Sequence, residues 1–285
     1  MREARETARG RQLVSMLTES RFGFLGAGVI AEVFIRRILK SGLAKPGDIL
    51  AYDINGPILD RLAITFHVRA MKSNAEVAAG SDFVFLAVPP LAVIPVLREV
   101  AATLRSDHMI LSLAAAVSTE LMEEAIGKPV PVVRLIPNTP SWIGQGMNPY
   151  CLGSHVGPGE AEKARALLKV FGKAEEIPEE QMGIATALTA VGPTYIFPVI
   201  AALADAAIAR DLPPSVALAA ACQVVLGAAA LVAQTERSPN SLNLMIGTRT
   251  LDEAAARKLF TQAVEDAYAK IQAAEAKVAA AGAQA

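Results

Sequence analysis

Short apolar runs alternate with longer segments of mixed apolar and polar residues between positions 21 and 152. In VIAEVFIRRILKSG the apolar positions recur at helical spacing, and Gly42 provides a stop. The apolar runs have the length of strands and are apolar almost throughout, which is typical of strands covered on both faces. The alternation predicts an α/β domain with a doubly wound parallel sheet. Its expected strands are FGFLG, DILAYD, FVFLAVP, MILSLA and VPVVRLIP.

The pattern changes after Cys151, and from about residue 181 only helical patterns remain. EAEKARALLKVFG predicts an amphipathic helix, and KAEEIPEE predicts a last strand and a turn. The later helices are apolar on nearly every side and cannot be solvated alone, so a homodimer or larger assembly is expected. The Ala-rich end, AAEAKVAAAGAQA, is expected to fray. The expected domains are an N-terminal extension (1–20), the α/β domain (21–155) and a helical oligomerisation and substrate domain (156–285) that is all-α from about residue 181.

Two uncharged stretches, 181–204 and 212–235, are long enough to raise the question of a membrane span. Both are rich in Ala, and Gly192-Pro193 interrupts the first. We interpret them as helices buried in a core or between subunits, with no membrane partner. The N-terminal segment has charges where a secretion signal needs an apolar core, so no signal is predicted.

Composition narrows the partners of the chain. Its 285 residues carry a formal net charge of -1, which provides no electrostatic footprint for nucleic acid. A small molecule is the expected partner. Cys151 and Cys222 are too few for a disulfide framework and lack metal-ligand spacing, so no metal site and a reduced, cytoplasmic setting are expected.

The stretch from Gly26 to Ala31 fits G-x-G-x-x-A directly after an expected strand and at the start of an expected helix. Gly26 permits a tight turn, Gly28 lets the backbone approach a pyrophosphate, and Ala31 lets the helix pack closely on the strand. The helix N-terminus then faces the anion. A nicotinamide or flavin dinucleotide is therefore predicted; the alternative is a glycine-rich turn without a ligand.

The second expected strand ends in Asp53, close to the position where an acidic residue binds the adenosine ribose. A carboxylate there accepts hydrogen bonds from the 2′-hydroxyl and repels a 2′-phosphate, and no Arg follows until Arg61. This favours NAD over NADP. The alternative is that Asp53 caps the turn before Asn55-Gly56-Pro57.

Hydride transfer to a carbonyl usually requires a proton donor such as His or Lys. The only histidines are His67, His108 and His155, and neither Lys nor His occurs between Lys173 and Lys258. If the helical domain supplies the substrate side, the reaction proceeds without such a group. An imine suits it, because its nitrogen can arrive protonated and needs only a hydrogen-bonding hydroxyl. His155, in a loop, is expected to be solvated.

The chain resembles the pyrroline-5-carboxylate reductase family in a series of motifs that occur in the family's order. They are FGFLGAGVIAEVFIRRILKSGL, LAVPP, SLAAAVS, RLIPNTP, TALTAVGPTYIF, ALADAAIARDLP and QVVLGAA. The resemblance implies a Rossmann domain, an all-helical domain that interlocks with its neighbour's, and reduction of Δ1-pyrroline-5-carboxylate to proline with NAD(P)H.

The resemblance also implies roles for individual residues. Gly26, Gly28, Val29 and Ile30 would hold the pyrophosphate, and Asn74 would sit by the adenosine. The nicotinamide side would be lined by Ala87, Val88, Pro89, Ala114 and Ala115. Asn138, on the cofactor side, and Thr139, on the substrate side, would close the cleft floor, unless Pro137-Asn138-Thr139-Pro140 is only a rigid turn. Substrate would also meet the helix that starts at Gly192, Pro193 and Thr194.

The chain departs from the family at several positions. The family usually has Lys at Pro89, Gly at Ala116 and Ala190, and Ser at Val191. Its V-T-S-P-G-G-T-T loop, which grips the substrate, is replaced by the shorter IGTRT (246–250). Here either Arg249 binds the substrate carboxylate, with Thr248 or Thr250 as the catalytic hydroxyl at the imine nitrogen, or Arg249 is an exposed residue and the grip is lost.

Two other functions remain open at this point. One is a nucleotide-binding paralogue with a different imine substrate or a regulatory, non-catalytic role. The other is a β-hydroxyacid dehydrogenase, which would need a lysine in the first long helix of the second domain; ATALTAVGPTYIF contains none.

Overall fold

A computed structural model describes residues 17–282 of the chain, so most of the expected N-terminal extension lies outside the described residues. The chain divides into two compact units. The first contains residues up to Ala190 together with the stretch from Ala267 onward, and the second spans Val191–Asp266. The first unit therefore includes residues 156–190 and the end of the chain, which the sequence pattern assigned to the helical domain.

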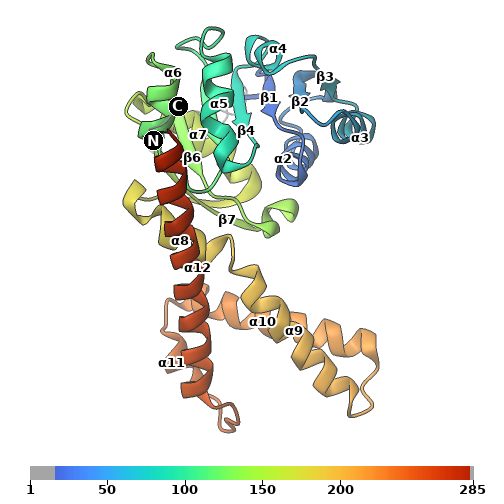
Figure 1. The fold of residues 1–285 in the computed structure, drawn as a ribbon. Helices are drawn as coiled ribbons and strands as arrows, with labels where there is room; N and C mark the ends of the chain where they lie inside the picture. The colour runs from blue at the N-terminus through green and yellow to red at the C-terminus, as the bar shows by residue number, and fades with distance from the viewer. Residues whose placement is uncertain (1–16, 283–285) are drawn as a thin grey trace, which may run out of the picture. The chain divides into compact units, whose positions relative to one another are not determined.

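The first unit is built on an eight-stranded sheet of order β3-β2-β1-β4-β5-β6-β7-β8 (Figure 1). Every neighbouring pair is parallel except β6 and β7, which are antiparallel. The predicted strands are confirmed, but β3 and β7 were missed. The strands are β1 (Phe22–Leu25), β2 (Ile49–Tyr52), β3 (Arg69–Ala70), β4 (Phe83–Leu86), β5 (Met109–Ser112), β6 (Val132–Leu135), β7 (Gly146–Leu152) and β8 (Gly172–Glu176).

Strand β7 was missed because its sequence, GMNPYCL, breaks the apolar pattern. Asn148 is fully buried there, and its side chain bonds to the Ser141 hydroxyl and to the Lys173 carbonyl. A buried polar residue is tolerated when it is hydrogen-bonded. Those partners are separated from β7 along the chain, so the local pattern contains no sign of them.

Helices cover both faces of the sheet because strand side chains alternate between two apolar clusters. Phe24 belongs to one cluster, where its ring stacks on Phe85 with centroids 4.7 Å apart, and α2, α3 and α7 pack there. Leu25 and Leu86 belong to the other, which α4, α5 and α6 cover. The helices are α2 (Val29–Lys40), α3 (Gly56–Phe66), α4 (Asn74–Ala79), α5 (Pro90–Val100), α6 (Thr119–Ile126) and α7 (Pro158–Leu168).

The rest of the described chain is helical, as predicted. Helix α8 (Met182–Thr189) ends the first stretch of the first unit, and α9 (Pro193–Ile208), α10 (Pro214–Thr235) and α11 (Pro239–Asn243) lie in the second. Helix α12 (Glu253–Gly282) begins in the second unit and ends in the first.

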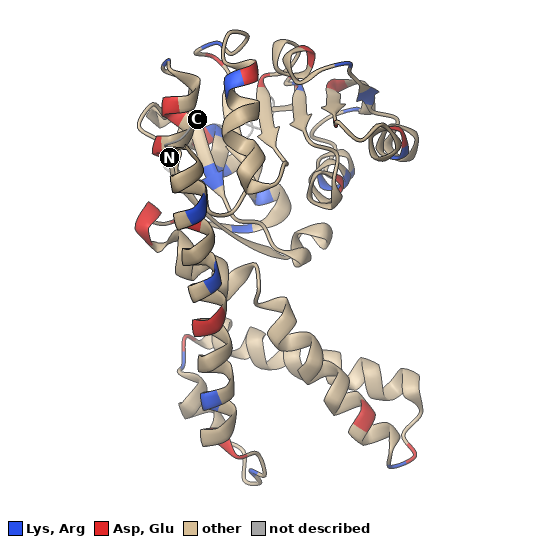
Figure 2. Cartoon of the chain, viewed as in Figure 1, with Lys and Arg blue, Asp and Glu red and all other residues tan. Residues whose placement is uncertain are grey.

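Helices α9 and α10 pack against each other through small residues, Ala204, Ala217 and Ala221. Figure 2 shows few charges on them, yet large apolar side chains are exposed, including Val224 at 62% and Leu226 at 64%. The apolar faces of α9 and α10 are therefore not buried within a single chain. Two stretches, Glu179–Ile208 and Pro214–Thr235, are long and apolar enough to cross a membrane, by length and composition only.

The expectation that the Ala-rich C-terminus frays was wrong. Helix α12 continues to Gly282, and Val278 is buried in the cluster with α5 and α6. Arg134 on β6, itself only 3% exposed, donates to Glu275 of α12 at 3.1 Å and to Glu179 at 3.0 Å. Glu179 also accepts from the backbone N–H and hydroxyl of Thr119, at the start of α6. One buried cation thus joins β6, α6 and α12.

Replacing Arg134 by Met removes both charge-assisted bonds, and we expect it to lower the free energy of unfolding by about 1–3 kcal/mol. The loss is smaller than for a fully buried pair because water reaches both carboxylates. The exposed Arg105–Asp107 pair is the matched control: R105M should cost less than about 1 kcal/mol. Urea unfolding at one fixed protein concentration measures both changes. If R134M and R105M lower the free energy of unfolding equally, the bonds of Arg134 do not stabilise the fold.

Candidate functional site

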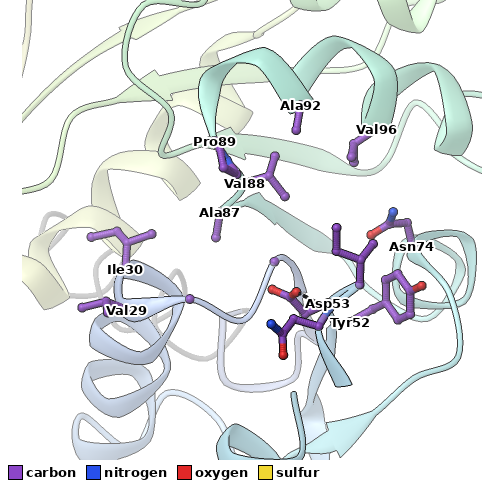
Figure 3. Close-up of a pocket in the computed structure, with 14 residues that line it drawn as sticks. Val29, Ile30, Tyr52, Asp53, Asn74, Ala87, Val88, Pro89, Ala92 and Val96 are labelled. Carbon is purple, nitrogen blue, oxygen red and sulfur yellow. Dashed lines mark hydrogen bonds between the residues drawn. The ribbon is translucent and has the colours of Figure 1, made fainter. Parts of the chain in front are cut away.

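A cavity of about 600 Å³ opens at the carboxyl ends of β1, β2 and β4 (Figure 3). The chain crosses from one side of β1 to the other at this point, because β1 pairs with both β2 and β4. In open α/β sheets ligands bind at such a crossing. The cavity is lined by Gly26, Gly28, Val29, Ile30, Tyr52, Asp53, Ile54, Asn55, Asn74, Ala87, Val88, Pro89, Ala92 and Val96.

The glycine turn between β1 and α2 has the geometry that an anion site requires. Gly26 adopts φ +99°, and a Cβ on it would lie 2.5 Å from the Ala87 carbonyl oxygen. Gly28 caps α2 and has open space around its missing side chain. The first bond within α2 runs from Glu32 N–H to the Gly28 carbonyl, so the N–H groups before Glu32 have no partner inside the helix. This cradle fits a dinucleotide pyrophosphate.

Asp53, at the end of β2, fastens the glycine turn. One carboxylate oxygen accepts from Ala27 N–H and the other accepts from Asn55 N–H, each at 2.8 Å. The second bond is the turn-capping contact that was the alternative reading of Asp53. Each carboxylate oxygen can accept a further bond, and Asp53 lines the cavity, so the capping contact and a contact to ribose are compatible.

Arg61, the first cationic residue after Asp53 in the sequence, forms an ion pair with another residue. Arg61 on α3 pairs with Glu32 of α2 at 2.9 Å, and Arg36 pairs with the other Glu32 oxygen at 3.2 Å. The hydrogen bond from Arg61, with support from Arg36, lowers the pKa of Glu32 below its usual value. Arg36 also lies over the rings of Phe66 and Trp142. Arg61 does not line the cavity.

The opposite wall is apolar and follows β4. Ala87, Val88 and Pro89 follow the end of the strand, and Ala92 and Val96 continue the wall on α5. Such a surface suits a flat aromatic ring better than a charged group. None of these five residues carries a charge.

Three residues predicted for the cofactor do not line this cavity: Ala114, Ala115 and Asn138. Ala114 is buried after β5, and Ala115 packs near Ile136 and Met182. Their roles stay predictions.

Asn138 has structural partners for both ends of its amide. Its Nδ2 donates to the Thr189 carbonyl at the end of α8, and its Oδ1 accepts from Met147 N–H on β7. These bonds support the reading of the Pro137–Pro140 segment as a rigid turn. The neighbouring Thr139 is exposed.

The substrate and catalytic residues predicted from the helical part lie in the second unit. Gly192 precedes α9, Pro193 is its first residue, and the Thr194 hydroxyl donates to the Val191 carbonyl. Thr248, Arg249 and Thr250 are exposed in the loop between α11 and α12. Within residues 17–282 no ion pair involves Arg249.

Several lining residues were missed by the sequence reading. Tyr52, Ile54 and Asn55 flank Asp53, and Ala92 and Val96 are at helical spacing after Pro89. The only sign of them in the sequence was that they lie close to residues already predicted to line the site.

Other candidate chemistry is sparse in the described chain. No cluster of His, Cys, Asp or Glu among residues 17–282 could hold a metal ion. His155 is exposed, and burial lowers the pKa of His108. Burial raises the pKa of the Cys151 thiol to about 12, so this cysteine is unreactive. Cys151 and Cys222 are both free.

Comparison with known proteins matches two family models. Residues 21–116 match the family described as NADP oxidoreductase coenzyme F420-dependent, and residues 179–274 match pyrroline-5-carboxylate reductase dimerisation. The second match covers both of the long apolar stretches, so a self-association domain explains their exposed faces.

Individual relatives agree along nearly the whole chain. The pyrroline-5-carboxylate reductase of Methanosarcina acetivorans is 31% identical over 87% of this chain and 95% of its own length. The enzyme of Escherichia coli is 31% identical over 80% and 85%, respectively. The solved structure of the Coxiella burnetii enzyme has a TM-score of 0.76 at 27% identity and covers 90% of this chain and 98% of that one.

Ala116 follows β5 in the left-handed region, at φ +67°, a conformation that favours Gly. An alanine there costs about 1–2 kcal/mol, partly offset by the lower entropy of its unfolded chain. We expect Ala116→Gly to raise the free energy of unfolding by about 0.5–1 kcal/mol. Ala273→Gly, at an exposed position inside α12, is the control and should lower it by a similar amount. Thermal and urea unfolding measure both variants. If A116G is less stable than the wild type, the backbone at Ala116 is not strained.

Proposed function

This chain belongs to the pyrroline-5-carboxylate reductase family, and we propose that it is a member that prefers NADH, held in the cavity at the ends of β1, β2 and β4. It is an NAD(P)-dependent oxidoreductase that acts on a CH–NH group, and it reduces Δ1-pyrroline-5-carboxylate to L-proline. The related reductases do not favour the alternative of a non-catalytic paralogue.

One observation carries the cofactor proposal: residues predicted separately for pyrophosphate, ribose and nicotinamide line a single cavity. The free N–H groups at the start of α2 would bind the pyrophosphate, between Gly28 and Ile30. Asp53 and Asn74 would face the adenosine, and the wall from Ala87 to Pro89 would hold the nicotinamide. When bound, the reduced nicotinamide supplies the hydride that adds to the imine carbon.

The preference for NADH is supported by the charges at the ribose end. Asp53 is an acceptor, and a 2′-phosphate would bring further negative charge against it. Arg61, the cation that could compensate, is paired with Glu32. A solved relative from Plasmodium falciparum is described with NADP bound, so the preference must be set by individual side chains and not by the fold.

Each unit is proposed to contribute substrate-binding residues, which are Thr139 in the first and Gly192, Pro193, Thr194 and Arg249 in the second. An imine that arrives protonated needs no histidine or lysine, and residues 174–257 contain neither. The Arg249 guanidinium would bind the substrate carboxylate. A hydroxyl of Thr248 or Thr250 would bond the imine nitrogen, which keeps its proton and becomes the amine as the hydride arrives.

The chain self-associates through its dimerisation domain. We propose a homodimer or larger ring in which the exposed faces of α9 and α10 are buried, because uncovered apolar helices are unstable in water. The proposed setting is the cytoplasm, in keeping with two free cysteines. Neither nucleic acid nor a membrane is proposed as a partner; the small-molecule imine is.

Steady-state rates with Δ1-pyrroline-5-carboxylate test the cofactor preference. We expect kcat/KM for NADH to exceed that for NADPH by about tenfold, which corresponds to about 1.4 kcal/mol. Asp53→Asn keeps the shape and removes the charge, so the ratio should fall toward one. A wild-type enzyme that clearly prefers NADPH would refute the role of Asp53, and absence of turnover with either cofactor would refute the substrate.

Arg249→Ala tests the carboxylate contact. Loss of one charge-assisted pair of bonds, about 1.5–3 kcal/mol, should raise KM for the imine at least tenfold and leave KM for NADH unchanged. Arg210→Ala, at an exposed position after α9, removes the same charge and should leave both constants unchanged. If R249A behaves like R210A, Arg249 is an ordinary surface residue.

A further inference from the structure

We propose that Glu99 is a positioning residue for cofactor choice: it fixes the Asn74 amide so that its carbonyl oxygen faces the adenosine end of the cavity and disfavours a 2′-phosphate. This inference rests on the proposed dinucleotide site. It assigns a function to a residue of α5 that does not line the cavity.

The contact itself defines which way the amide points. Asn74 is the first residue of α4 and is only 6% exposed. Its Nδ2 donates to a Glu99 carboxylate oxygen at 2.8 Å. An ionised carboxylate can only accept, whereas an amide has one donating and one accepting end. The nitrogen of Asn74 must therefore face Glu99, and turning the amide over would set oxygen against oxygen.

The other end of the amide is consequently an acceptor. Asn74 lines the cavity, and in Figure 3 its oxygen is turned toward the interior while its nitrogen is turned away. Asp53 lines the same cavity with a second set of acceptor atoms. Among the polar side chains that line the cavity, Asp53 and Asn74 therefore present oxygens, and a ribose hydroxyl can donate to them. A 2′-phosphate has mainly acceptor oxygens and meets repulsion at both.

The Asn74 amide could in principle adopt the opposite orientation. With its amide turned over, Asn74 would direct two N–H donors into the cavity, which is what a phosphate requires. Glu99 excludes that orientation from outside the cavity. The residue that selects the cofactor need not touch it, because the selection is made through the orientation of a neighbour.

Glu99→Gln separates this role from ordinary packing. Glutamine has nearly the same shape but can either accept from or donate to Asn74, so the amide becomes free to turn. We expect Kd for NADPH relative to NADH, measured by fluorescence titration, to fall about threefold to tenfold, the size of one modest hydrogen-bond difference. Glu120→Gln, on the exposed side of α6, removes the same charge elsewhere and should leave the ratio unchanged.

A double-mutant cycle with Asn74→Ala shows whether Glu99 acts through Asn74. In the N74A background E99Q should no longer change the ratio. An unchanged ratio in E99Q alone, or an equal change in both backgrounds, would overturn the proposal, the latter because it indicates only the field of the lost charge.

Two further measurements keep the test decisive. Glu99→Asp retains an acceptor-only partner and should restore the wild-type ratio. Should E99Q not fold, 2′-deoxy-NADH tests the acceptor role of Asn74: its affinity relative to NADH should fall further in the wild type than in N74A, where only Asp53 still accepts from the hydroxyl, and equal losses would overturn the proposal. The ratio of the wild-type Kd values for NADH and NADPH separately tests the proposed preference for NADH. The preference and the role of Glu99 can therefore fail independently.

Discussion

The close approach of the β1 turn to the end of β4 is the constraint on which the site depends. Gly26 can turn at φ +99° beside the Ala87 carbonyl only because it lacks a side chain. That turn brings the N-terminus of α2 to the edge of the sheet and leaves the cavity between β2 and β4 open. A single Cβ at this point would move α2, the apolar wall or both, and the site would lose its anion cradle.

Carboxylates fasten this framework in several places. Asp53 holds the glycine turn, Glu32 holds Arg61, and Glu99 orients Asn74. For Asn74 the acceptor-only carboxylate decides which end of the amide faces it, whereas the Ala27 N–H and the Arg61 guanidinium can only donate, so there the carboxylate fixes only their position. The buried Arg134 reverses the arrangement, since one cation orders two carboxylates from different helices. Charge here serves geometry more than net stability, since an ion pair taken out of water gains little overall.

The second unit obeys a different constraint. Helices α9 and α10 meet through small residues and leave large apolar side chains exposed. A unit built this way is complete only when another surface covers it, which agrees with its match to a dimerisation family. The same exposed faces explain why hydropathy alone also marks these helices as candidate membrane spans. Composition cannot distinguish a lipid from a second copy of the chain, because both offer an apolar surface.

The sequence by itself determined the parallel strands, the glycine turn, the helical second part and the family, because each depends on local spacing or on long runs of matching residues. It missed β7, whose buried Asn148 is satisfied by residues outside the strand. It also wrongly expected the last helix to fray, because Arg134 and the α5 and α6 residues that pack on Val278 lie far from that helix in the sequence. Only the tertiary structure showed that Asp53 bonds Ala27, that Glu32 engages Arg61, and that Glu99 sets the Asn74 amide. Hydrogen-bond direction between distant side chains leaves no periodic trace in a sequence, so it becomes visible only once the chain is folded.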